Sequence, residues 1–270
     1  MSSRLYRNAD IDLPIIRKHV QHMLELFDLR TKGSFNLDES DHFGFMALCF
    51  SYKQLEHAHS IAILVDAGQY ADANILARVM LEGLVLLGWA SLLPEERGHR
   101  WRAYALVSDW KVLVEKKQRG EEVAPEVEQN LKLRLSELGE PFLTSGARKN
   151  SIENYPNPYQ KSWQVNPDGS KVELSKMIDD LNDPQLKELY ENLSQLGHWT
   201  PQGIGENIRR NGSGVWLELE SKRYAAQACA VTFKVLGNTL EIVSAHLRLG
   251  AEIEVQNVID SYLKELGNSA

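Results

Sequence analysis

Cysteine is scarce in this sequence, which holds only Cys49 and Cys229 in 270 residues. Both lie in apolar segments with helical periodicity, so we expect two buried thiols and not a disulfide or a redox pair. Low cysteine use is typical of proteins from a reducing compartment. The composition is otherwise that of an ordinary globular chain, long enough to bury a sizeable core.

Uncharged apolar runs are short. The longest is GLVLLGWASLL at residues 83–93, whereas a membrane-spanning helix needs roughly 20 apolar residues. The opening residues, MSSRLYRNADIDLP, lack the apolar core of a signal peptide. We therefore expect a soluble, cytoplasmic protein that makes no contact with a membrane.

Basic residues are in the minority, because 30 Lys and Arg face 37 Asp and Glu and give a formal net charge of −7. Such a surface repels nucleic acid on average, so RNA would have to bind at a local basic patch. Two segments, 141–172 and 199–217, are weakly basic and interleave aromatic residues. That pattern suits either a single-stranded nucleic acid or a lid over a site, and we favour the lid.

The signatures of common cofactor and metal sites are also missing. No phosphate-binding glycine loop or nucleophile elbow occurs, and GIGENI at residues 203–208 lacks the strand and helix that a dinucleotide fingerprint requires. His19 and His22 have the spacing of two metal ligands on one helix. Further candidate ligands are Glu56, His57 and His59, but no tight signature completes the set. We therefore expect no cofactor and no metal.

Helical periodicity covers most of the chain, and proline and glycine mark the ends of the periodic segments. The third segment is apolar on nearly all sides, which is typical of a helix at the centre of a bundle. The expected helices cover about 12–30, 41–67, 70–92, 94–119, 125–139, 221–250 and 252–266.

The fold we expect is all-α: one helical domain over residues 1–270, with about seven to nine helices in a bundle-like array. Residues 140–172 form a loop-rich insertion. The turn signals NPDG at 166–169 and NGSG at 211–214 predict short hairpins near 160–175 and 208–218. The long C-terminal helix is rich in alanine and can pack closely on a neighbour in the chain or in a homodimer; the alanines are Ala225, Ala226, Ala228 and Ala230.

A polar row interrupts the apolar third helix. Asn74, Arg78 and Glu82 follow each other four residues apart, so they lie on one face. Arg78 and Glu82 can pair at this spacing. The apolar surroundings imply burial, where an unpaired charge is very costly. The row is therefore expected to face a polar cavity or polar groups on another helix.

A second polar row precedes a helix break in KELYENLSQLGHWTP, residues 187–201. Tyr190, Ser194 and His198 also follow each other four apart. This row can supply the partners that Arg78 and Glu82 need. We therefore predict that the two rows face each other inside the protein.

These two segments resemble a prokaryotic family catalogued as a domain of unknown function. Its members share a helix like ILARVMLEGLVLLGWA, with arginine and then glutamate four residues later, and a downstream segment like LYENLSQLGHWTP. The resemblance covers about residues 45–205. It implies one family site, made of Arg78, Glu82, Tyr190, Ser194 and His198, and brings no activity.

A weaker resemblance is to the HEPN superfamily of helical domains, many of them RNA-cleaving effectors. Their motif places an arginine a few residues before a histidine on one helix, but the positions before His198 are Glu191, Asn192 and Leu193. Arg78 would have to supply the cation from another helix. In that case His198 would shuttle a proton and Arg78 would neutralise the developing phosphate charge, without a metal.

Three interpretations of the polar rows stay open: bracing of a helical core, ligand binding and catalysis. The function we expect is binding of a small anionic or nucleotide-like ligand in a buried polar pocket lined by Asn74, Glu82, Tyr190 and Ser194. The alternative is a metal-independent ribonuclease effector in stress or phage defence, with His198 and Arg78 as catalytic residues.

Overall fold

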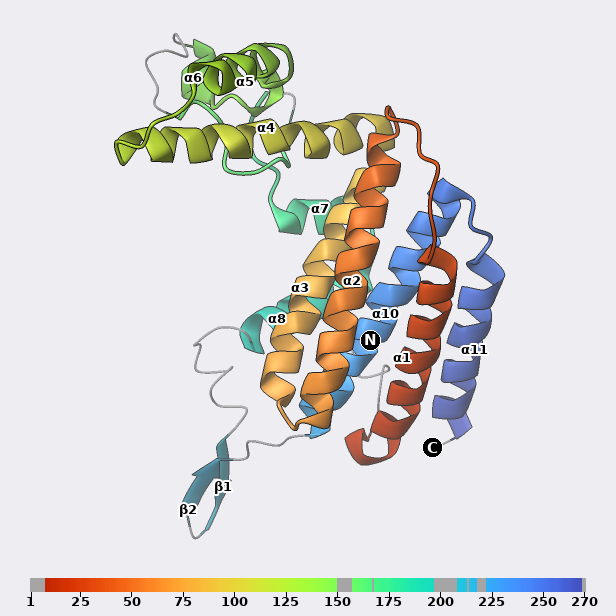
Figure 1. Cartoon of the computed structure of the whole chain (residues 1–270). Coiled ribbons are helices and arrows are strands. Elements are labelled where there is room, and N and C mark those ends of the chain that lie inside the picture. Colours follow the sequence, from red (N-terminus) through yellow and green to blue (C-terminus); the bar gives the residue numbers. More distant parts are fainter. Residues whose placement is uncertain are drawn as a thin grey trace. The chain divides into compact units, whose positions relative to one another are not determined.

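The computed structural model describes residues 8–149, 157–166, 168–196, 208–212, 214–217 and 222–268 (Figure 1). This part of the chain contains ten α-helices, one short 3₁₀ helix and one two-stranded sheet. The all-α fold class is therefore confirmed. The helices outnumber the expected seven to nine because two short ones were not recognised in the sequence: α6 (Ser145–Lys149) has five residues and α7 (Leu174–Leu181) has eight. The apolar residues of α7 do have helical spacing, but over only two turns.

The chain forms two compact units, which are described separately below. Unit 1 comprises Met1–Leu37, Ala47–Trp89 and Met177–Ala270, and unit 2 comprises Asp38–Met46 and Ala90–Lys176. The expectation of one domain over residues 1–270 stays a prediction.

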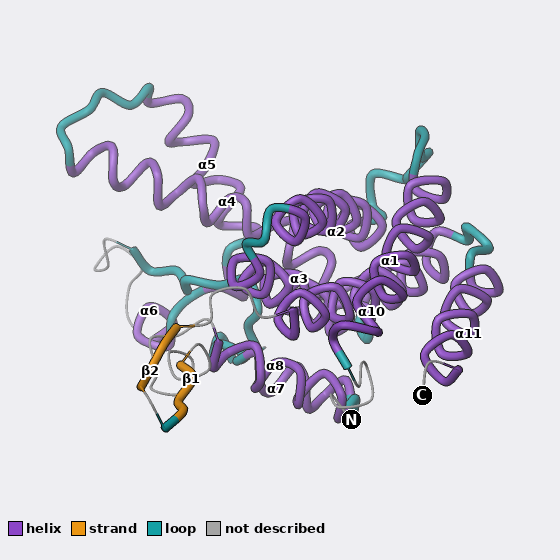
Figure 2. The backbone as a smooth tube through the Cα atoms, turned by 90° about the horizontal axis from the view of Figure 1, so that it is seen from below, coloured by secondary structure: helices purple, strands orange, loops and turns teal. Residues whose placement is uncertain are grey.

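Unit 1 is built around α10, the most thoroughly buried helix described. α1 packs along α10, and α11 packs against both (Figures 1 and 2). The four alanines of α10 are almost fully buried within this unit, so the close packing that they allow is with helices of the same chain. The helices concerned are α1 (Ala9–Thr31), α10 (Lys222–Leu247) and α11 (Glu252–Asn268).

Buried polar contacts join α2 (His42–Asp66) and α3 (Tyr70–Ser91) to this core. The Gln54 side-chain amide on α2 donates to the Met80 carbonyl on α3 at 2.9 Å. A Cβ at Gly83 would lie 2.8 Å from that same amide, so glycine makes room for the contact. The Thr232 hydroxyl on α10 lies 3.9 Å from the Met80 Sδ. One face of the third helix is thus buried against α2 and α10, whereas Ile75 and Val79 on α3 are 49% and 44% exposed. The central helix is α10, which differs from the expectation that all-round apolar character placed the third helix at the centre.

Helix ends follow the expected signals, with one difference. Asp41 caps α2 by accepting from the Gly44 N–H at 2.8 Å, and Gly68 adopts a φ of +75° where that helix stops. By contrast, α1 begins at Ala9, before the expected start near residue 12, so that Pro14 lies inside the helix and not in its first turn. The helix begins earlier because the Asn8 side chain accepts from the Asp10 N–H at 3.0 Å and so caps it.

Unit 2 is centred on α4 (Pro94–Gln118) and α5 (Pro125–Leu138), two helices joined by a short connection. The η2 turn (Glu140–Phe142) and α6 follow. Side chains of α4 hold the loop-rich insertion in place: Arg100 donates to the Val165 carbonyl at 2.7 Å and Lys111 to the Gln160 carbonyl at 2.8 Å. The described part of the insertion is thus tied to α4 through backbone acceptors.

Both predicted hairpins are present. The strands β1 (Ile208–Asn211) and β2 (Gly214–Leu217) pair antiparallel, with Asn211 opposite Gly214 at the closed end. The other hairpin is a single bridge between Val165 and Lys171. It is closed by Gly169, whose φ of +80° is the backbone conformation that its turn signal predicts.

Two helices, α3 and α10, are long and apolar enough to cross a membrane by length and composition alone. Their most apolar windows are 61% and 72% buried within the protein. The core helices of soluble proteins have the same properties, so the absence of membrane contact stays a prediction.

Candidate functional site

The ion pair expected on α3 is present. The Arg78 Nε–H donates to Glu82 Oε1 at 3.0 Å, one helical turn apart. The side chains are 20% and 35% exposed, respectively, so solvent reaches both charges. The pair is therefore only half-buried, which differs from the burial that its apolar surroundings implied.

Tyr190 meets this ion pair from another helix. The Arg78 guanidinium carbon lies 5.7 Å from the centre of the Tyr190 ring, within the range of a cation–π contact. Tyr190 is on α8 (Pro184–Leu196), whose buried leucines Leu186, Leu189 and Leu193 recur at helical spacing and fix the face that packs. The polar row of α3 and the first residue of the second row are therefore in contact.

The position of α8 depends on residues that the sequence reading did not single out. Asp183 caps the helix by accepting from the Gln185 N–H at 2.8 Å, with Pro184 at the first helical position. Lys234 on α10 lies 3.4 Å from Asp183 Oδ2 and 3.2 Å from Gln185 Oε1. The Asp-Pro pair before a periodic segment is a helix-start signal that could have revealed this cap.

Asn74 faces the core. It is 3% exposed, and its amide donates to the Tyr70 carbonyl at 2.9 Å and to the Tyr224 carbonyl on α10 at 2.8 Å. Its Oδ1 atom is buried and has no hydrogen-bond partner among the described residues. These contacts fasten α3 to α10 one turn before Arg78.

Ser194 lies one turn beyond Tyr190 on α8. Its Oγ atom is shielded from solvent and makes no hydrogen bond within the described segments. Burying a hydroxyl without a hydrogen-bond partner costs free energy of folding. The next residue of this row, His198, lies outside the described residues, so its predicted catalytic role and its place relative to Arg78 stay predictions.

His19, one of the histidines considered as metal ligands, lies in a buried environment made mainly of aromatic rings. His19 on α1 is fully buried among the rings of His22, Phe233 and Tyr262. Its Nε2 atom lies 3.4 Å from Glu265 Oε2 on α11. Burial lowers the pKa of His19 below its ordinary value of 6.5, and the Glu265 carboxylate partly offsets that effect. Across the described ranges, no group of three or more His, Cys, Asp or Glu side chains is placed to hold a metal ion.

Neither cysteine forms a disulfide. Cys229 is buried, and burial raises the pKa of its thiol to about 12, so the nucleophilic thiolate does not form near neutral pH. Cys49 is only partly buried, which differs from the expectation of two buried thiols.

A family of unknown function (DUF5677) matches residues 44–215, more than half of the chain. No curated protein and no solved structure matches the chain. The matched segment contains α3, which carries the first polar row, and α8, which carries Tyr190 and Ser194 of the second. Nothing in the comparisons supports the HEPN resemblance. The predicted resemblance to a domain of unknown function is confirmed, and the chain belongs to the DUF5677 family.

Proposed function

We propose that the Arg78–Glu82 ion pair and the Tyr190 ring form one wall of a binding site for a small anionic, nucleotide-like ligand in a cytoplasmic protein. The observation that carries the proposal is the contact at 5.7 Å between the Arg78 guanidinium and the Tyr190 ring, made by a side chain that is still 20% exposed. A cation that is both oriented and open to solvent is suited to meet an anion.

The chemistry of the three side chains supports this choice of ligand. A guanidinium binds phosphate and carboxylate groups through charge-assisted hydrogen bonds and stacks on aromatic rings. Glu82 holds the Nε edge of Arg78 at 3.0 Å and thereby fixes the plane of the guanidinium. The Tyr190 ring offers a flat surface on which a nucleobase can stack.

Ser194 adds a second reason. Its shielded hydroxyl, without a partner in the described part of the chain, is on the same helix as Tyr190, one turn away. A ligand oxygen is one group that would satisfy it. The competing interpretation, a dry structural brace, is disfavoured by the 35% exposure of Glu82.

The test is thermal unfolding of the full chain with inorganic phosphate, AMP and GMP as probes. A ligand at ten times its Kd stabilises the folded state by about 1.4 kcal/mol, which raises Tm by roughly 2–5 °C. We expect such a shift with at least one probe, and its loss in Arg78→Gln.

Arg30→Gln is the matched control, because Arg30 forms a comparable exposed pair with Glu254, 32% and 41% exposed, between α1 and α11. The rise in Tm that a probe causes in Arg30→Gln should equal the rise that it causes in the wild type. The proposal is wrong if no probe at about 10 mM shifts Tm, or if Arg78→Gln responds like Arg30→Gln.

The same preparation tests the ribonuclease alternative. Cleavage of single-stranded RNA by the wild type, abolished in His198→Ala with Tm unchanged, would assign catalysis to this site and replace simple binding.

A further inference from the structure

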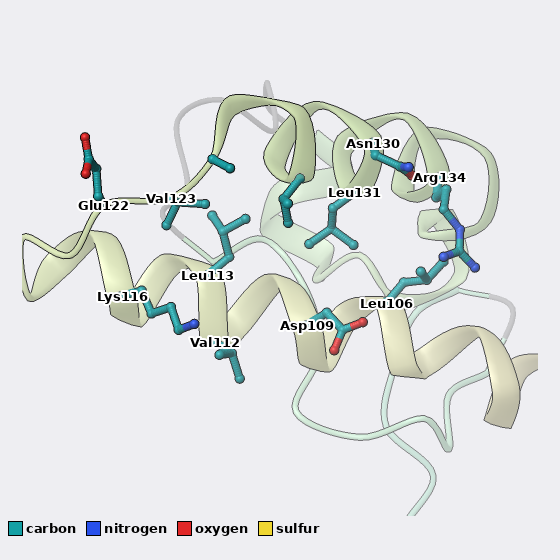
Figure 3. A pocket seen from close by; sticks show the side chains of 12 residues that line it. Leu106, Asp109, Val112, Leu113, Lys116, Glu122, Val123, Asn130, Leu131 and Arg134 are labelled. Atoms are coloured by element: carbon teal, nitrogen blue, oxygen red, sulfur yellow. The ribbon is translucent and has the colours of Figure 1, made fainter.

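The α4–α5 hairpin of unit 2 carries a groove of about 530 Å³ (Figure 3). Its floor is made by three buried leucines, Leu106, Leu113 and Leu131. Each helix presents a stripe of residues at i, i+3 and i+7 to the groove, which is the spacing of one helical face. The stripes are Asp109, Val112 and Lys116 on α4, and Val127, Asn130 and Arg134 on α5.

The rim of this groove is open. Val112 and Val127, one on each wall, are 51% and 59% exposed. Sites for small molecules enclose most of their ligand, typically about 70–90% of its surface. Two exposed aliphatic side chains beside a leucine floor fit the flatter face of a macromolecule, as when helices pack in a bundle.

The charges at the two ends of the groove have a pattern that identifies the partner. Asp109 and Arg134 lie at one end, and Lys116 and Glu122 lie at the other (Figure 3). None of these four side chains makes an ion pair or a hydrogen bond within the described residues. Each end thus offers one acid and one base, so the surface is complementary to a copy of itself.

We propose that a second copy of the chain docks on this groove, so that two α4–α5 hairpins form an intermolecular four-helix arrangement. A two-fold axis along the groove lays α4 of each subunit on α5 of the other. Asp109 then faces Arg134 of the partner subunit, and Lys116 faces Glu122 of the partner subunit. Because the contact is isologous, each pair occurs twice.

The size of the face sets the strength of the dimer. α5 has 14 residues, about 21 Å of helix, and two helices side by side cover on the order of 400 Å² per subunit. That is about half of a standard stable interface. The dimer is therefore weak, with a Kd in the range of roughly 10–500 µM.

Sedimentation equilibrium of the full chain between roughly 10 and 500 µM tests the proposal. We expect a monomer–dimer equilibrium for the wild type. Asp109→Arg and Arg134→Asp should each weaken it by about tenfold or more, because each change places like charges opposite each other twice. Gln129→Arg, an exposed change on α5 two residues from Val127 and so on the opposite face of the helix, should leave the Kd unchanged.

A one-to-one mixture of the two weakened variants gives the sharpest result. In the mixed dimer the introduced arginine of one variant faces the introduced aspartate of the other, and the two native partners also match. Association should therefore return to near wild-type strength. A wild type that stays monomeric at 500 µM, a dimer indifferent to both substitutions, or a mixture that fails to associate would each overturn the proposal.

Discussion

Whether the Arg78–Glu82 pair braces the fold or serves a ligand can be decided by its contribution to stability. The perturbation is a double-mutant cycle made of Arg78→Gln, Glu82→Gln and the double variant, which removes the charges. Glu82→Gln keeps the shape of the side chain, whereas Arg78→Gln also shortens it. At 20% and 35% exposure the pair is partly solvated. We therefore expect a coupling free energy of about 0.5–1 kcal/mol.

Arg78→Gln also removes the contact with Tyr190 at 5.7 Å, which contributes about another 0.5–1 kcal/mol. The total cost is then about 1–2 kcal/mol for Arg78→Gln and about 0.5–1 kcal/mol for Glu82→Gln. A buried brace would behave differently, because removing one partner leaves an uncompensated charge and costs about 3–5 kcal/mol.

Urea unfolding at 25 °C, monitored by circular dichroism, measures the free energy of unfolding of the wild type, both single variants and the double variant. The matched cycle on Arg30 and Glu254 gives the value for an ordinary exposed pair. A loss above about 3 kcal/mol for either single variant would refute the reasoning and show that the pair is structural. High salt should reduce the coupling further, since exposed charges are screened.

Three further predictions follow from the buried groups. Asn74→Ala should lower the free energy of unfolding by about 2 kcal/mol, because the Tyr224 carbonyl loses its donor, whereas Asn130→Ala on exposed α5 should cost less than about 0.5 kcal/mol in the same denaturation assay. Since the folded-state pKa of His19 lies below 6.5, the unfolded chain binds more protons, so stability should fall as the pH drops from about 7 toward 5. His19→Leu should flatten that part of the stability–pH curve measured by urea unfolding. Cys229 should react with a thiol reagent only after unfolding, because its folded pKa is about 12, and early labelling of this residue would contradict that burial.

Helix ends were predictable where the chain carries a local signal. Pro94 and Pro125 open α4 and α5 at their first positions, and Gly68, with a φ of +75°, follows α2. Such residues act within one turn of the backbone, so the sequence alone contains the information. The end of α10 was expected at Gly250, but the helix stops at Leu247, where Arg248 adopts a φ of +57°. The start of α1 was placed less well, since the Asn8 cap competes with the more conspicuous Pro14.

The candidate site was predictable only in part. Spacing places Arg78 and Glu82 on one face of α3, and their ion pair follows from helix geometry. The contact with Tyr190 depends on how α8 is held by Asp183 and Lys234, residues about 50 positions apart that no local pattern connects. The hydrogen bond from the Asn74 amide to the Tyr224 carbonyl was also unpredictable from spacing, because it depends on the packing of two helices that are far apart in the sequence.

The boundary of the family match gives α10 an unexpected importance. The match ends at residue 215, whereas α10 begins at Lys222 and supplies the acceptor for Asn74 and the hydroxyl beside Met80. A fragment cut to the matched residues would keep both polar rows but expose to water the side of α3 that contacts α10. Within unit 1, the matched segment supplies α2, α3 and α8, whereas α1, α10 and α11 lie wholly outside it. The helix that fastens Asn74 is therefore not part of the segment by which the family is recognised.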